Sequence, residues 1–110
     1  MTSSLSTHVL DLTHGTPASG IQVRLLQGSD VLFSGLTDED GRCPGLQPMA
    51  PGTYRIEFSV AAYFRSKGID LPDPPFIDVV GIDFGIADSG GHYHVPLLVS
   101  PFGYSTYRGS

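Results

Sequence analysis

Cysteine, basic residues and long apolar runs are all scarce in this sequence, and each shortage narrows what the protein can be. Cys43 is the only cysteine, so no disulfide forms within the chain, which fits a reducing compartment. No apolar run approaches the ~20 residues that a membrane-spanning helix needs. Six basic residues stand against eleven acidic ones, and the net charge of −5 argues against nucleic-acid binding. Residues 1–5 lack the basic and apolar regions of a secretory signal, so we expect a soluble, intracellular protein.

Turn-forming and aromatic residues are abundant, which favours short strands over long helices. The chain has 14 glycines, 9 prolines, 5 tyrosines and 6 phenylalanines in 110 residues, the size of one domain spanning 1–110. Glycine and proline mark residues 14–20 and 70–75 as loops. Alternation and β-forming residues predict strands over residues 7–12, 21–26, 31–36, 53–60, 76–86, 93–99 and 104–108.

An apolar segment over residues 60–67 is the one predicted helix. Arg65 and Lys67 lie near its end and Gly68 lies just past it, as a helix C-terminus prefers. Together with the strands, this pattern predicts an all-β protein, a two-sheet β-sandwich of seven or eight strands with one short helix.

The penultimate predicted strand carries a histidine on the face that points away from the core. Its better core face consists of Tyr93, Val95, Leu97 and Val99. His94 therefore points outward, between Pro96 and Leu98, and a partly apolar outward face is expected to be covered by another subunit. The simplest assembly places four polar side chains on this surface: His8, His94, Ser105 and Tyr107. A partner-covered patch of this kind would form a pocket.

Taken one by one, these polar residues also have simpler interpretations. A histidine on a strand is more often satisfied or solvent-facing than catalytic, and His14 and His92 are assigned to that class. His92 and His94 have the spacing of two metal ligands on one strand face. No Cys-x-x-Cys or His-Glu-x-x-His accompanies them, so we expect no metal. Arg42 follows Asp-Gly in a turn and by itself indicates a solvated loop charge.

Other kinds of catalytic site find no support in the sequence. No serine lies in a Gly-x-Ser-x-Gly context for nucleophilic attack. A phosphate-binding glycine loop and a dinucleotide fingerprint are both absent, so no cofactor is expected. The aspartates are expected to serve as turn, cap or surface residues, among them Asp11, Asp38, Asp40, Asp83 and Asp88.

Three separated motifs resemble the signatures of 5-hydroxyisourate hydrolases. Residues 5–11 read Leu-Ser-Thr-His-Val-Leu-Asp, followed by a Gly-x-Pro-Ala-x-Gly loop at residues 15–20. Residues 40–42 read Asp-Gly-Arg. Residues 92–110 match a third signature, whose closing Tyr-Arg-Gly-Ser sets these hydrolases apart from the hormone-carrying transthyretins. The order and spacing of the motifs extend the resemblance over nearly the whole chain.

This resemblance implies a transthyretin fold and the hydrolysis of 5-hydroxyisourate to 2-oxo-4-hydroxy-4-carboxy-5-ureidoimidazoline in urate degradation. It implies a homotetramer, a dimer of dimers whose central channel holds the sites, in the cytoplasm or, in a eukaryote, the peroxisome. His8 and His94 would activate water and transfer protons, in an order left open, while Arg42 would orient the substrate and stabilise the oxyanion. The expected substrate-binding residues are Ser105, Tyr107, Arg108, Gly109 and Ser110. Neither a metal nor a cofactor is required.

Two other functions are compatible with a sandwich. A transthyretin-like carrier of a small aromatic ligand would have aliphatic or hydroxyl residues in place of His8 and His94, and no Tyr-Arg-Gly-Ser tail. An immunoglobulin-type interaction domain would explain the strands but neither the histidines nor the tail. The sequence favours the hydrolase over both.

Overall fold

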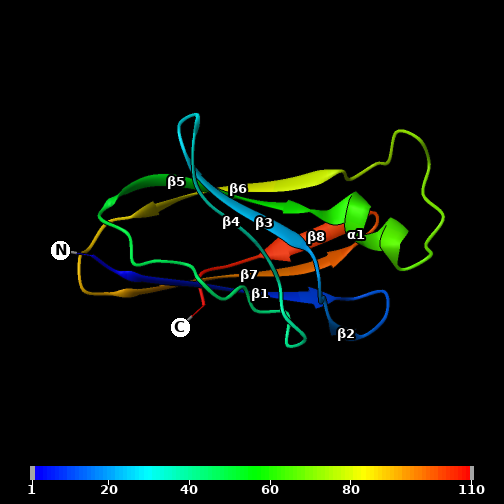
Figure 1. The fold of residues 1–110 in the computed structure, drawn as a ribbon, viewed down its shortest axis with the longest axis horizontal. Coiled ribbons are helices and arrows are strands. Elements are labelled where there is room, and N and C mark those ends of the chain that lie inside the picture. Colours follow the sequence, from blue (N-terminus) through cyan, green and yellow to red (C-terminus); the bar gives the residue numbers. More distant parts are fainter. Residues whose placement is uncertain (1, 110) are drawn as a thin grey trace.

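Two four-stranded sheets pack face to face, and a short helix lies at one end of them (Figure 1). This computed structural model describes residues 2–109. One sheet has the order β2-β1-β7-β8 and the other β4-β3-β5-β6. The elements within the described range are β1 (Ser4–Asp11), β2 (Thr16–Pro17), β3 (Gln22–Gln27), β4 (Asp30–Leu36), β5 (Gly52–Ser59), α1 (Val60–Ser66), β6 (Val79–Ile86), β7 (His92–Ser100) and β8 (Gly103–Thr106). The predicted sandwich with one short helix is confirmed.

The first strand and the penultimate strand lie side by side in the middle of one sheet, drawn in blue and orange in Figure 1. They pair in parallel, from Ser4 opposite His92 to Asp11 opposite Val99. Inward positions of both strands are buried, whereas most outward positions are half-buried or exposed. His8 and His94 lie on the outer face, as the alternation predicted.

Apolar side chains from both sheets and the helix fill the space between the sheets. The largest fully buried ones include Val9, Val23, Leu25, Ile56, Phe58, Phe64 and Leu97. All four residues predicted for the core face of β7 are buried. Burying a side chain of this size stabilises the fold by about 1.5–3 kcal/mol. Because the core occupies the inner faces, the outer face of β1 and β7 can carry polar groups.

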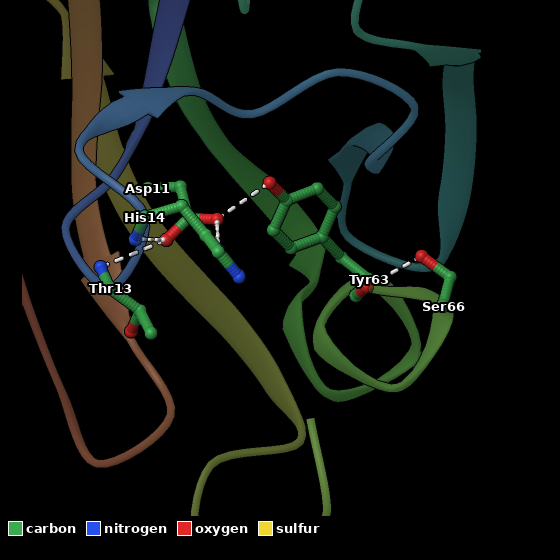
Figure 2. Close-up of polar contacts among 5 residues, drawn as sticks. All are labelled: Asp11, Thr13, His14, Tyr63 and Ser66. Atoms are coloured by element: carbon green, nitrogen blue, oxygen red, sulfur yellow. Dashed lines mark hydrogen bonds and ion pairs between the residues drawn. The ribbon is translucent and has the colours of Figure 1, made fainter. Parts of the chain in front are cut away.

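A buried carboxylate at the end of β1 ties that strand to the helix (Figure 2). Asp11 is 1% exposed and accepts a hydrogen bond from the Tyr63 hydroxyl at 2.7 Å. Backbone N–H groups of Thr13 and His14 donate to it at 2.9 and 3.0 Å, and Nδ1 of His14 lies 2.5 Å away. Burial opposes the charge, but these hydrogen bonds outweigh it and lower the pKa of Asp11. Asp11 is the last residue of β1; its carboxylate caps the turn that follows, one of the roles predicted for the aspartates, but it is buried and not on the surface.

Several strand boundaries differ from the prediction: β1, for example, begins at Ser4 and not at residue 7, and two of the differences have clear local reasons. β2 lies inside residues 14–20, which were predicted to be loop, because Thr16 and Pro17 pair with the end of β1. β6 begins at Val79 and not at residue 76, because the Asp78 carbonyl accepts the first N–H groups of α1. Across the part of the chain that the structure describes, no helix has both the length and the apolar character to span a membrane.

Candidate active site

Serine and histidine side chains alternate across the outer face where β1 meets β7. Ser4 lies opposite His92 and Ser6 opposite His94 in the parallel register. Oγ of Ser4 lies 2.5 Å from Nδ1 of His92, and Oγ of Ser6 lies 3.2 Å from Nε2 of the same ring. Oγ of Ser6 also lies 2.8 Å from Nδ1 of His94. The two imidazoles stack with centroids 6.4 Å apart. We call these four side chains the serine–histidine array.

Three members of this array were not predicted as site residues. His92 is exposed, as expected, but it also bonds to Ser4 and Ser6. These contacts join residues 86 to 88 positions apart, so they depend on a parallel pairing for which the sequence has no local signal. The sequence feature that could have identified them is strand alternation, because Ser4 and Ser6 lie on the same strand face as His8.

A tight loop brings Arg42 next to His8. Gly41 has a φ of +77°, and a Cβ there would lie 2.4 Å from the Val9 carbonyl oxygen, so the approach requires glycine. The Val9 N–H donates to the Gly41 carbonyl at 2.8 Å, and His8 and Arg42 form an isolated bridge. The Asp38 carboxylate accepts the Arg42 N–H at 3.0 Å. The predicted Asp-Gly-Arg turn therefore places an arginine beside the histidines.

His94 lies in surroundings that disfavour its protonated form. Its burial, the charge of Arg42 and the electrostatic influence of the neighbouring His8 and His92 lower its pKa from the ordinary histidine value. Arg42 and His8 both act on His94, and His8 and Arg42 are themselves paired in a bridge. Nε2 of His94 has no hydrogen-bond partner within residues 2–109, so a neutral ring could accept a proton there.

The tail of the chain returns to His94. The Gly109 N–H donates to the His94 carbonyl at 2.8 Å. A Cβ on Gly109 would lie 2.4 Å from Cδ2 of the His94 ring, so glycine lets the backbone rest against the imidazole. The strand predicted over residues 104–108 ends earlier, at Thr106, whose hydroxyl donates to the Pro96 carbonyl at 2.7 Å. Ser110, predicted to bind substrate, lies outside the described residues.

The other predicted substrate-binding residues within the described range are divided between the two faces of the sheet. Ser105 is exposed on the outer face, opposite Leu98. The Arg108 guanidinium stacks over the Tyr93 ring, 4.2 Å from its centroid, and so lies toward the core side of β7. Tyr107 and Arg108 line a cavity of about 340 Å³, which His94 also lines together with residues of β6. The structure therefore gathers His8, Arg42, His94 and Gly109 most closely.

Metal ligation was the competing interpretation of the strand histidines. Within residues 2–109, no group of three or more histidine, cysteine, aspartate or glutamate side chains is placed to hold a metal ion. His92 and His94 are bonded to serine hydroxyls. As described, this face offers proton-transfer groups and an arginine.

Fold and site together define a transthyretin-like sandwich that carries a polar, histidine-based site on its outer face. This chain belongs to the HIUase/Transthyretin family, whose model matches residues 5–109. A curated relative, the 5-hydroxyisourate hydrolase of Pseudomonas aeruginosa, is 48% identical over 114 residues, which cover 96% of this chain and 90% of the relative.

Solved structures of both branches of the family resemble the chain. The 5-hydroxyisourate hydrolase of Klebsiella pneumoniae has a TM-score of 0.84 and 36% identity, covering 98% of this chain and 94% of its own. Sea bream transthyretin in complex with thyroxine has a TM-score of 0.86 and 31% identity, covering 96% of this chain and 93% of its own. Because an enzyme and a transthyretin share this backbone, the choice between functions depends on side chains.

Proposed function

We propose that this protein is a 5-hydroxyisourate hydrolase of urate degradation. The substrate is a small, planar, oxygen-rich purine derivative, and hydrolysis opens its six-membered ring at a carbonyl carbon bonded to nitrogen. The observation that supports this function best is the meeting of His8, Arg42, His94 and Gly109 at one place on the outer face. The Pseudomonas aeruginosa relative, which bears this activity in its name, is similar over nearly the full chain.

Ring opening requires a base, a group that stabilises the oxyanion, and an acid. His94, kept neutral by its surroundings, removes a proton from water as the water oxygen attacks the carbonyl carbon. Arg42 orients the substrate and stabilises the negative charge that develops on the carbonyl oxygen. His8 donates a proton to the leaving nitrogen as the C–N bond breaks.

The tail is proposed to close one side of the pocket. Gly109 already lies against the His94 ring, and Tyr107 and Arg108 line a cavity that His94 borders together with the core-side residues Tyr93 and Val95. Ser105, Tyr107, Arg108, Gly109 and Ser110 would contact the substrate. Arg108 would add a positive charge in a chain whose net charge is −5.

A homotetramer, a dimer of dimers acting in the cytoplasm, is proposed as the active form. Half-buried His94 and Leu98 share the outer face with buried Pro96, and a mixed surface of this kind suits a second copy of the chain. The sites would then lie in a channel between copies. Light scattering should give about four chain masses. A stable and fully active monomer would exclude the shared channel.

An assay with freshly prepared 5-hydroxyisourate separates this function from the carrier function. A hydrolase accelerates the loss of substrate absorbance above the uncatalysed decay. A carrier binds an aromatic ligand and leaves that decay unchanged. Absence of any acceleration at high protein concentration would overturn the proposed function.

A further inference from the structure

The serine–histidine array runs from the proposed base to a histidine on the surface. Its hydrogen bonds lead from Nδ1 of His94 to Oγ of Ser6 at 2.8 Å, and on to Nε2 of His92 at 3.2 Å. His94 and Ser6 are half-buried, whereas His92 is exposed in the single chain. Because a hydroxyl both donates and accepts, Ser6 can pass a proton from one ring to the other.

The second contact of Ser4 suits one direction of these hydrogen bonds. With its hydroxyl directed at the Gly91 carbonyl, 3.5 Å away, its oxygen is free to accept from Nδ1–H of His92, 2.5 Å away. Nε2 of a neutral His92 then accepts from the Ser6 hydroxyl, and Ser6 accepts from Nδ1–H of His94. In this arrangement Nε2 of His94 carries a lone pair, which is the state that a base requires.

We propose that Ser6 is a positioning residue for His94, and that Ser6 and His92 form a relay that carries the proton of the attacking water out to solvent. This inference rests on the proposed function, because it needs His94 to act as the base. It gives Ser6 and His92 roles in proton transfer, in addition to the catalytic roles proposed for His8, Arg42 and His94.

The proton transfers balance as follows. The water O–H bond breaks while its oxygen bonds to the carbonyl carbon, and the proton joins Nε2 of His94. The Nδ1 proton of His94 moves to Ser6, and the Ser6 proton moves to Nε2 of His92. The cationic His92 releases its Nδ1 proton to solvent. Rotation of the serine hydroxyls and proton exchange with water restore the first arrangement.

Three substitutions in the intact protein test the relay. Ser6→Ala removes the hydroxyl and should lower kcat on the order of 10-fold or more, with KM little changed, because proton transfer and not binding is impaired. Ser6→Thr keeps the hydroxyl and should retain most of the activity. His92→Ala should lower kcat in dilute buffer, and added imidazole should restore it by accepting the proton directly. Rates are corrected for decay measured without protein.

Ser34→Ala is the matched control, since Ser34 is exposed on β4 in the other sheet and should leave turnover unchanged. An unchanged kcat in Ser6→Ala, equal loss in Ser6→Thr and Ser6→Ala, or a defect in His92→Ala that imidazole does not restore would each overturn the relay. If Ser6→Ala melts early and loses its fold, the His92→Ala variant and its rescue by imidazole decide the test, because His92 is exposed. Wild-type protein without turnover would overturn the proposed function instead, so the two failures are distinguishable.

Discussion

At one end of β1, Asp11 is almost fully buried and accepts hydrogen bonds from Tyr63, from Thr13 and from both the backbone and the ring of His14 (Figure 2). At the other end, the serine–histidine array is half-open, and Nε2 of His94 has no partner within the described residues. A fully satisfied buried carboxylate fixes its surroundings, whereas an array with a spare proton site can take part in a reaction. One strand thus supports the fold at one end and the site at the other.

The pKa of a key group is lowered in both clusters, but this favours a charged carboxylate in one and a neutral imidazole in the other. Burial alone would raise the pKa of Asp11, but hydrogen bonds lower it and keep the carboxylate charged. Burial, the charge of Arg42 and the neighbouring histidines lower the pKa of His94 and so favour the neutral imidazole. A permanently charged acceptor stabilises structure, and a neutral imidazole is ready to receive a proton.

Removing the tail should have the largest effect on activity, because the tail lies against His94 of the serine–histidine array and not against the Asp11 cluster. Deletion of residues 107–110 should abolish hydrolysis, while the sandwich remains folded because its core residues lie upstream. Turnover and thermal melting would be compared for the truncated protein and for proteins tagged at either end. A tag after Ser110 should harm activity more than one before Met1. Full activity in the folded truncation would show that the tail is only a chain end.

Replacing a histidine by alanine in each of the two clusters is the next test. His94→Ala or His8→Ala should reduce turnover on the order of 10²-fold or more, the usual contribution of a positioned acid or base, with little change in melting. His14→Ala is the matched control, since it removes a partner of Asp11 and should lower the melting temperature while turnover persists. Near-normal turnover in His94→Ala would contradict the role assigned to that residue.

Tyr63→Phe should weaken only the structural cluster. It removes the hydroxyl that donates to the buried Asp11 carboxylate, which should lower the free energy of unfolding by about 2 kcal/mol. Urea unfolding measures this change, and kcat below the melting temperature should equal that of the wild type. Tyr104→Phe, on an exposed tyrosine of β8, should leave stability unchanged. Equal stability of the two variants would contradict the importance of the Asp11 hydrogen bonds.

The smallest expected effect is a difference in pH dependence: mild acid should reduce activity before it reduces stability. The folded pKa of Asp11 is lowered, so its stabilisation is present above the ordinary carboxyl value and is lost only as pH falls through the lowered pKa. His94 must be neutral to act as a base, and kcat/KM should fall along an acid limb centred below about 6.5. Between these ranges the protein should lose activity while it stays folded. Parallel pH profiles of kcat/KM and melting temperature would show whether the two losses coincide.

Local patterns predicted much of this structure. Alternation identified the strand around Ile56 and the core face of β7, because a half-buried strand shows its period directly in the sequence. The turn at Gly41 was also predictable, since a polar turn that needs a positive φ favours glycine. Motif resemblance, and not spacing alone, pointed to His8, Arg42 and His94.

Contacts between distant segments could not be predicted in this way. The parallel pairing of β1 with β7 leaves no local mark, so the bonds of Ser6 to His92 and His94 remained hidden. The two-residue strand β2 is too short for a period. Arg108 stacks on Tyr93 because its tail turns back along β7, which depends on tertiary packing.

The side-by-side placement of β1 and β7 has a consequence for biosynthesis. The strand with His8 is made early, but its neighbour with His94 leaves the ribosome 88 residues after Ser6, and Gly109 follows later still. At about 5–20 residues per second, β1 waits several seconds or more with one edge open to wrong partners. The site can therefore form only once the residues around His94 and Gly109 have emerged. Long-range strand pairing of this kind also slows folding.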